Sequence, residues 1–344
     1  MKKIKKSVKI IIAVALVIVL LLASGVIFYL SKLNLIKFSN GKFTWNGSPD
    51  MSDSETLDEE SRMNDAIADL EVKDAIDATG EIYKDKRFLN ILLIGTDERA
   101  ENFSENARGD SCMIMSIGKK DGSLKLASLE RGMGVPILEG KYKGQYDWLT
   151  HTFRYGGADL MMREVRECFK VDVERYIRVN FTTFKKGIDS VGGIDINLTA
   201  AEAAYVNGET NRKIYIAGTN HLDSNAALSY ARCRHIDSDW HRIERQRNVI
   251  QAVVTKTKDL SVGELNTLLN NVLPLVQTNL TRLEITELLL SAPKYRGVQI
   301  KQMTVPISGS YGGMRGLGGR SLFSVDFDTN AKALREFIYD VKSE

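Results

Sequence analysis

The sequence predicts an α/β (α+β) protein with a central mixed β-sheet flanked by helices on both faces and preceded by one N-terminal transmembrane helix. Three observations lead to this prediction. A long apolar segment without charge lies near the N-terminus, short apolar runs alternate with segments of helical period after residue 88, and no linker interrupts that alternation. The composition, 43% apolar and 26% charged, is typical of a folded globular protein.

The apolar segment spans residues 10–31, a run of 22 residues without a charged side chain. About 20 helical residues cross the hydrocarbon core of a bilayer. Residues 1–9 contain five lysines, and lysine-rich flanks stay in the cytoplasm. We therefore expect a single-pass anchor in the cell membrane, with residues 1–9 cytoplasmic and the rest of the chain extracytoplasmic. A cleaved signal peptide is the alternative, because Ala23, Ser24 and Gly25 are small, but its apolar stretch usually ends after about 7–15 residues.

Residues 32–85 are expected to form an acidic extracytoplasmic stalk. Between Pro49 and Gly80 there are eleven acidic side chains and two basic ones. The apolar residues of this stretch also have a spacing that suits an amphipathic helix, namely Ala66, Ile67, Leu70, Val72 and Ile76. Neither alternative assigns chemistry to the stalk. Residues 86–344 then form one domain.

Within this domain the first strand is expected at residues 89–95, a continuous apolar run ending in glycine that suits a strand buried on both faces. Residues 112–117 and 124–129 flank a turn-rich pentapeptide and predict a β-hairpin. The other expected strands lie at 175–180, at 194–198 and near 298–305. The expected helices lie at 158–169, at 184–190, after a cap at Asp223 or Ser224, at 240–256, twice after Leu260 and at the C-terminus, and a glycine-rich loop is expected at 309–319.

Unexplained charge gathers in three short segments, at residues 95–99, 108–110 and 232–247. The first directly follows a predicted buried strand, where α/β sheets place ligands. Asp97 and Asp110 offer the hard oxygen ligands that Mg²⁺ takes, with phosphate and water completing its shell. Arginines pair bidentately with phosphate oxygens and keep their charge. Arginines that converge near two aspartates therefore predict a bound diphosphate.

The third segment continues into the helix predicted at 240–256. Arg242 and Gln246 are four residues apart and share one face of that helix. Asp239 precedes Arg242 by three residues and can cap the helix. The predicted hairpin ends at Arg131, which adds a further guanidinium to the candidate site.

Several other residues have a simpler interpretation. We expect Arg245, Arg247 and Asp237 to face water, and we expect His235 and His241, which lack partner spacing, to be neither general base nor metal ligand. The cysteines are expected to be small buried side chains, namely Cys112, Cys168 and Cys233. A net charge of +3 and a local basic cluster outside the membrane do not suit nucleic-acid binding. No P-loop, G-x-S-x-G or H-E-x-x-H motif is present, which disfavours an NTPase, a serine hydrolase or a zinc protease.

The order of motifs resembles the LytR-CpsA-Psr family over roughly residues 88–256. The first motifs are NILLIGTDER, ARGDSCMIMSI and LASLERG with VPI. They are followed by THTFRYGGADL, YIRVNFTTFKKGIDSVGGIDINL, GTNHLDSNAALSYARCR and DSDWHRIERQRNVI. Because so many motifs appear in family order, the resemblance is specific.

This resemblance implies a phosphotransferase outside the membrane. Such a protein moves a phosphate-linked glycopolymer, for example wall teichoic acid or capsule, from a polyprenyl diphosphate carrier to peptidoglycan, and it uses Mg²⁺. By motif position, Asp97 and Asp110 would hold the metal. The expected catalytic residues are Arg108, Arg131, Asp239 and Arg242, and the expected diphosphate-binding residues are Arg99, Arg232, Arg234 and Gln246. The family fold also implies an apolar tunnel for the lipid, although Leu160, Met161, Val165 and Ile188 more simply predict core.

Two departures from the family pattern bear on the site. The family usually has Pro-Arg-Asp where this chain has Glu130-Arg131-Gly132, so an aspartate is missing. Glu130 is expected to point to the opposite face of a strand from Arg131 and so not to replace it. The loop between Arg234 and Asp239 is also shorter than is common. Two other functions remain open on the sequence, namely hydrolysis of a polyprenyl diphosphate and non-catalytic binding or regulation of lipid-linked envelope precursors.

Overall fold

A computed structural model describes residues 31–43, 54–98, 103–104, 107–234 and 236–341 of the chain. The predicted cytoplasmic tail and all but Ser31 of the predicted transmembrane segment lie outside these residues. Within the described part of the chain, no helix combines the length and the apolar character needed to cross a membrane.

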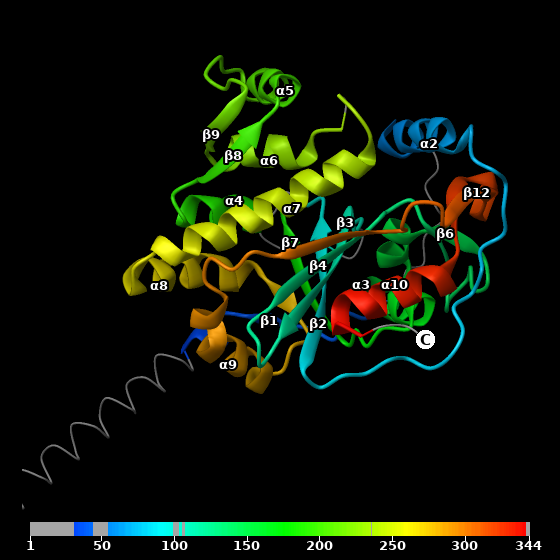
Figure 1. The fold of residues 1–344 in the computed structure, drawn as a ribbon, viewed down its shortest axis with the longest axis horizontal. Helices are drawn as coiled ribbons and strands as arrows, with labels where there is room; N and C mark the ends of the chain where they lie inside the picture. Colours follow the sequence, from blue (N-terminus) through cyan, green and yellow to red (C-terminus); the bar gives the residue numbers. More distant parts are fainter. Residues whose placement is uncertain (1–30, 44–53, 99–102, 105–106, 235, 342–344) are drawn as a thin grey trace, which may run out of the picture.

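The centre of the fold is a seven-stranded mixed sheet (Figure 1). Its strands, in spatial order, are β1 (Lys37–Phe38), β10 (Gln277–Thr278), β7 (Arg175–Asn180), β2 (Phe88–Thr96), β3 (Ser111–Gly118), β4 (Leu124–Leu129) and β11 (Lys301–Val305). The central strand β2 runs antiparallel to β3 and parallel to β7, whereas β4 and β11 are parallel. The predicted mixed sheet is confirmed, and so is the predicted hairpin, because β3 and β4 pair antiparallel.

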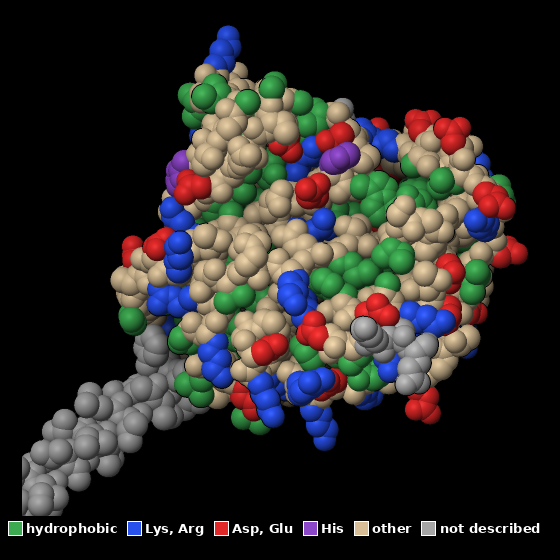
Figure 2. Space-filling view, viewed as in Figure 1, with side chains coloured by type: hydrophobic (Ala, Val, Ile, Leu, Met, Phe, Trp, Pro, Cys, Tyr) green, Lys and Arg blue, Asp and Glu red, His purple; other side chains and the backbone are tan. Residues whose placement is uncertain are grey.

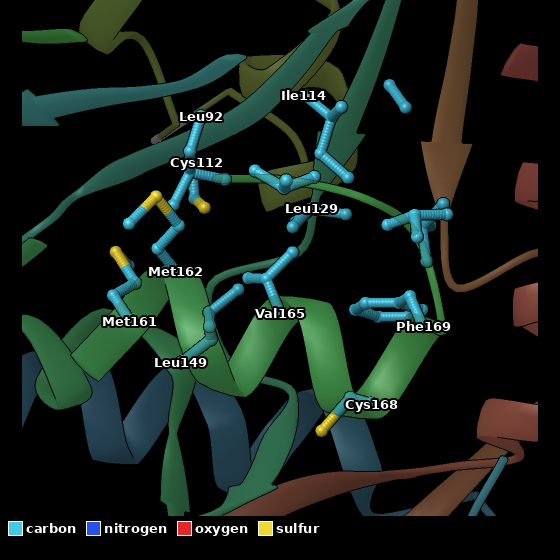
Figure 3. Close-up of a cluster of buried hydrophobic side chains, with 14 of the residues drawn as sticks. Leu92, Cys112, Ile114, Leu129, Leu149, Met161, Met162, Val165, Cys168 and Phe169 are labelled. Carbon is cyan, nitrogen blue, oxygen red and sulfur yellow. The ribbon is translucent and has the colours of Figure 1, made fainter. Parts of the chain in front are cut away.

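Helices α3 (Leu149–Phe169) and α10 (Phe327–Tyr339) cover one face of this sheet. Figure 3 shows strand side chains such as Leu92 and Ile114 pointing toward Val165 and Phe169 of α3. Met161 and Val165 are fully buried in this cluster, as the core interpretation predicted. Helix α3 begins at Leu149, before the predicted residue 158. The prediction missed its first part because the kink at Gly156 and Gly157 interrupts the apolar period on which the prediction was based.

Helices α7 (Asp239–Lys256), α8 (Val262–Val272) and α9 (Arg282–Ser291) lie beyond the other face of the sheet. This face is apolar as well, but Leu93 on the central strand β2 and Met115 on its neighbour β3 are only partly buried. They pack against the same buried cluster as Ile250 and Val254 of α7. Side chains in the middle of a seven-stranded sheet are normally closed off from solvent. The sheet therefore has one tightly packed face and one face that is loosely packed around Leu93 and Met115, although Ile91, Met113 and Leu126 on that second face are buried.

A smaller unit stands at one end of the sheet. It contains the hairpin of β8 (Ile194–Leu198) and β9 (Gly218–Leu222) with α4 (Phe181–Ser190), α5 (Ala200–Thr210) and α6 (Ser224–Arg232). Its core includes Ile188, which confirms the core interpretation of that residue as well. Asp223 is the N-cap of α6, since its Oδ1 accepts a hydrogen bond from the Ala226 amide at 2.9 Å, and the predicted cap is confirmed. Strand β9 and helix α5 were not predicted.

Two further hairpins complete the domain. Strand β5 (Gly134–Pro136) pairs with β6 (Tyr146–Trp148), and β12 (Tyr311–Arg315) pairs with β13 (Ser321–Val325). Strand β12 lies inside the predicted glycine-rich loop at 309–319, so that part of the prediction is wrong. Its glycines serve close backbone approach, because a Cβ on Gly312 would come within 2.6 Å of the Glu71 carbonyl oxygen.

The acidic segment differs from the solvated stalk that its composition suggested. Leu33 and Ile36 are buried against the sheet, and β1 forms its edge. Helix α2 (Ser54–Ile67) lies beside the β12–β13 hairpin (Figure 1), and acidic side chains gather at the surface of this part of the molecule (Figure 2). Asp58 of α2 is exposed. Its Glu59, however, is 3% exposed. Part of the predicted stalk therefore belongs to the folded domain.

Candidate functional site

Three charged residues meet at one edge of the sheet because of strand direction. Asp97 directly follows β2, Asp110 directly precedes β3, and Arg131 follows the end of β4. Since these strands are antiparallel neighbours, all three positions lie at the same end. The Arg108 amide donates a hydrogen bond to Asp97 Oδ1 at 3.3 Å, and Arg131 Nη1 donates to Asp110 Oδ1 at 3.4 Å.

The N-terminus of α7 adds a second group of charges. Arg242 Nη2 donates to Asp239 Oδ2 at 2.8 Å, and the other Asp239 oxygen lies 3.8 Å from Arg131 Nε. Gln246, one turn further along α7, accepts a hydrogen bond from Ser111 Oγ at 2.9 Å. The N-cap of α7 is Ser238, so the predicted capping role of Asp239 is wrong. Its carboxylate pairs with arginines instead of backbone amides.

A buried carboxylate that sequence reasoning missed lies at the centre of the cluster. Glu59 Oε1 accepts a hydrogen bond from Arg131 Nη1 at 2.7 Å and from Arg234 Nη1 at 3.4 Å. Its other oxygen is 3.9 Å from Arg108 Nη1. Burial alone would raise the pKa of Glu59, but the charge of Arg131 and the hydrogen bond from it, with Arg108 and Arg234, hold that pKa below its usual value. Three guanidiniums thus converge on one ionised group.

Glu130 also belongs to the site, which corrects the expectation that it points away from Arg131. Its carboxyl group lies close enough to that of Asp239 for the two charges to repel, and its Oε1 accepts a hydrogen bond from the Gly132 amide at 3.2 Å. Burial and the neighbouring Asp239 charge raise the pKa of Glu130 to about 8. The strand alternation behind the expectation does not apply, because β4 ends at Leu129 and residue 130 already lies in the turn.

Not every predicted site residue joins this cluster. Arg232 is exposed, and its guanidinium stacks 5.0 Å from the Phe181 ring centre, beside Lys185 and Arg212 in a separate polar hollow. Arg99 lies outside the described residues, as does His235. His241 is exposed, and its Nδ1 is 3.0 Å from Ser238 Oγ. The structure therefore brings together Asp97, Arg108, Asp110, Arg131, Arg234, Asp239, Arg242 and Gln246 of the predicted set.

Arg245 and Arg247 do not face water, so that prediction is wrong. Arg245 is 4% exposed, donates to Glu202 Oε1 at 2.7 Å and pairs with Asp237. Arg247 is 8% exposed and donates to Gln302 and Thr304, 3.0 and 2.8 Å away. The partners Glu202, Gln302 and Thr304 lie far away in sequence, and for that reason the local charge pattern did not reveal them. Both arginines fix α7 to its neighbours.

The carboxylates at the strand ends suit a magnesium ion that a phosphate ligand would help to bind. Within the described ranges, no three His, Cys, Asp or Glu side chains are grouped as a metal site. Mg²⁺ is usually bound through one or two carboxylates together with substrate phosphates and water. Burial raises the pKa of Asp110, and the nearby carboxylates Glu59 and Asp97 add to this rise while Arg131 opposes it. A divalent cation beside Asp97 and Asp110 would relieve this crowding of negative charge.

These contacts define a class of protein: a mixed α/β domain whose strand ends and helix N-terminus form an arginine-rich site with the chemistry to bind a phosphorylated ligand. Residues 51–336 match the model of the LytR_cpsA_psr family. The chain belongs to the LytR-CpsA-Psr family.

Among similar curated proteins are two teichoic acid transferases. The chain is 34% identical over 197 residues to "Polyisoprenyl-teichoic acid--peptidoglycan teichoic acid transferase TagU" of Bacillus mycoides, covering 56% of this chain and 61% of the relative. It is 32% identical over 181 residues to the corresponding TagT of Bacillus subtilis, covering 51% and 55%. The matched segment thus spans less than two thirds of each relative.

Solved structures share the fold. A structure described as "TagT bound to LIIa-WTA" matches with a TM-score of 0.59 and 24% identity, covering 78% of this chain and 97% of that one. The family protein YwtF (TagT) with bound octaprenyl pyrophosphate lipid matches with a TM-score of 0.55 and 21% identity, covering 77% and 96%.

Proposed function

We propose that this protein transfers a phosphate-linked glycopolymer from a polyprenyl diphosphate carrier to peptidoglycan, outside the cell membrane and with Mg²⁺. The convergence of Arg108, Arg131 and Arg234 on one carboxylate within 4 Å carries the proposal. Such a cluster can bind an anion with several oxygens, and a diphosphate presents them on two neighbouring groups. The names of the TagU and TagT relatives support the same transfer reaction.

The loosely packed face of the sheet supports a lipid-linked donor. One face of α7 carries Arg242, Gln246, Ile250 and Val254, so this face changes from polar to apolar along the helix. Beneath its apolar end lie partly buried strand residues, Leu93 and Met115 among them. A diphosphate at the arginines would place a polyprenyl tail between α7 and the sheet. The structure of TagT with octaprenyl pyrophosphate supports this class of ligand.

The site residues have distinct roles in this proposal. Arg108, Arg131 and Arg242 offset charge on the phosphoryl group and on the leaving polyprenyl phosphate, which is the main contribution a protein makes to phosphoryl transfer. Arg234 and Gln246 hold the diphosphate, with Arg99 expected to join them. Asp97 and Asp110 would hold Mg²⁺, which supplies further charge neutralisation when bound. Asp239 orients Arg242 and Arg131 through the contacts described above.

Two assays separate transfer from the alternative functions. A labelled polyprenyl diphosphate-linked glycan is incubated with the protein, with or without peptidoglycan oligomers. We expect label on peptidoglycan only when both substrates are present, and we expect EDTA to abolish transfer and added Mg²⁺ to restore it. Equal release of product without peptidoglycan would favour the hydrolase. Binding of the donor without turnover would favour a non-catalytic binder.

A further inference from the structure

Helix α2 is attached to the domain at several points. Asn64 Oδ1 accepts hydrogen bonds from Arg315 Nη1 at 3.1 Å and from Ser321 Oγ, which connects α2 to the β12–β13 hairpin. The chain that follows α2 pairs with β12, because the Lys73 amide donates to the Gly313 carbonyl at 3.1 Å and the Gly313 amide donates to the Glu71 carbonyl at 2.9 Å. Helix α2 is therefore attached through its last turn and through the chain segment that follows it.

The docked helix places a carboxylate among the arginines. As described above, Glu59 bridges Arg131, Arg234 and Arg108, and its pKa is lowered. Without this carboxylate, three buried or half-buried guanidiniums would repel one another at short range. Glu59 therefore neutralises part of the charge of the cluster and, together with Asp110 and Asp239, determines where the guanidinium of Arg131 points.

The same helix occupies the space beside Gly132. A Cβ at Gly132 would lie 2.0 Å from Met63 Cε, and Met63 is one helical turn after Glu59. Gly132 is the position at which the family pattern usually has an aspartate. Position 132 has no side chain in this protein, and Met63 of α2 fills the space that a side chain there would need. The carboxylate of Glu59, also on α2, accepts a hydrogen bond from Arg131.

We propose that Glu59 is a positioning residue for the transfer reaction, holding Arg131, Arg108 and Arg234 in the arrangement that binds the phosphoryl group. The inference rests on the proposed function, since it assigns Glu59 a role in that same site. Met63 fits closely against Gly132, and α2 is attached to the domain at Asn64. Both contacts indicate that α2 is a permanent part of the site and not a segment that leaves the site when the donor binds.

The test uses full-length protein in detergent and compares three variants in the transfer assay. Glu59→Gln keeps the shape but removes the charge, and we expect kcat at saturating donor to fall about 100-fold, the size of effect that misplaced catalytic groups produce. Met63→Ala alone is the control and retains transfer. The triple variant Glu59→Gln/Met63→Ala/Gly132→Asp supplies a carboxylate from the loop instead, and we expect it to regain most of the lost kcat. A merely structural role for Glu59 would not produce this rescue.

A second readout does not depend on turnover. The side-chain N–H signal of Arg131 is assigned by its loss in Arg131→Lys. Its protons are expected to exchange slowly with solvent in the wild type, quickly in Glu59→Gln and slowly again in the triple variant. Wild-type protein that transfers nothing, while the Arg131 signal still depends on Glu59, would count against the proposed function alone. Two results would overturn the inference: a Glu59→Gln protein that transfers as fast as the wild type, or one that transfers faster, which would identify α2 as an inhibitory plug.

Discussion

Replacing Arg131 by lysine is expected to lower the rate of glycopolymer transfer by about 10²- to 10³-fold, the loss seen when one preorganised donor to a transition-state oxygen is removed. Arg131 contacts Glu59 and Asp110 through Nη1 and approaches Asp239 through Nε, so its planar fork lies between three carboxylates. A lysine keeps the charge but cannot occupy these directions at once. The measurement is kcat for transfer of a labelled lipid-linked glycan to peptidoglycan oligomers.

A matched control keeps this experiment specific. Arg87→Lys makes the same chemical change at an exposed arginine that pairs with Asp85, remote from the arginine cluster. We expect this variant to transfer at the wild-type rate. Thermal melting of both variants shows whether the fold is retained. An Arg131→Lys protein that is folded and fully active would contradict the assignment of Arg131 to catalysis.

Replacing Leu93 by phenylalanine is expected to abolish the use of long-chain donors while sparing short ones. Leu93 is a partly buried residue on the central strand, beneath the apolar end of α7. A larger ring would fill the space assigned to the polyprenyl tail, so the KM of a long-chain donor should rise steeply. A water-soluble donor with a short prenyl chain needs only the arginine cluster and should be used with little change. The measurement is kcat/KM for both donors.

The neighbouring residue provides the control for packing. Leu92 points to the opposite, tightly packed face and is 0% exposed. Leu92→Phe should therefore lower the free energy of unfolding by about 1–3 kcal/mol, the usual cost of overpacking a core. Leu93→Phe should lower the free energy of unfolding much less, because the face of the sheet beneath α7 has room for the larger ring. Equal destabilisation by the two substitutions would show that no lipid space exists on the α7 side.

Strand patterns in the sequence were enough to predict the edge of the sheet that carries the site. The apolar run of β2 and the β3–β4 hairpin were recognisable locally, and strand direction then brings Asp97, Asp110 and Arg131 together. Arg232 and Arg234 appeared equivalent in sequence but separate in the structure. Arg232 ends α6 whereas Arg234 lies beyond the extended C-cap Cys233, so the two side chains leave the chain in different directions.

The role of α2 could not be predicted from its own residues. Its acidic composition is typical of a solvated segment, and only the docking of the helix on β12 and β13 selects Glu59 for burial. The same limit applies to Arg245, whose partner Glu202 is 43 residues away and comes from a helix that was not predicted. Charges far apart in sequence pair through tertiary contacts, and a single sequence does not contain that information.

Photocrosslinking with a polyprenyl diphosphate that carries a diazirine at the end of its tail locates the lipid-binding region of the protein. We expect the arginine cluster to bind the diphosphate while the tail lies between α7 and the loosely packed face of the sheet. Peptide mapping should then find label on residues 89–93, 113–117 and 250–254, and inorganic pyrophosphate should compete with labelling. Label on α3 or α10, or labelling that pyrophosphate does not reduce, would contradict this expectation.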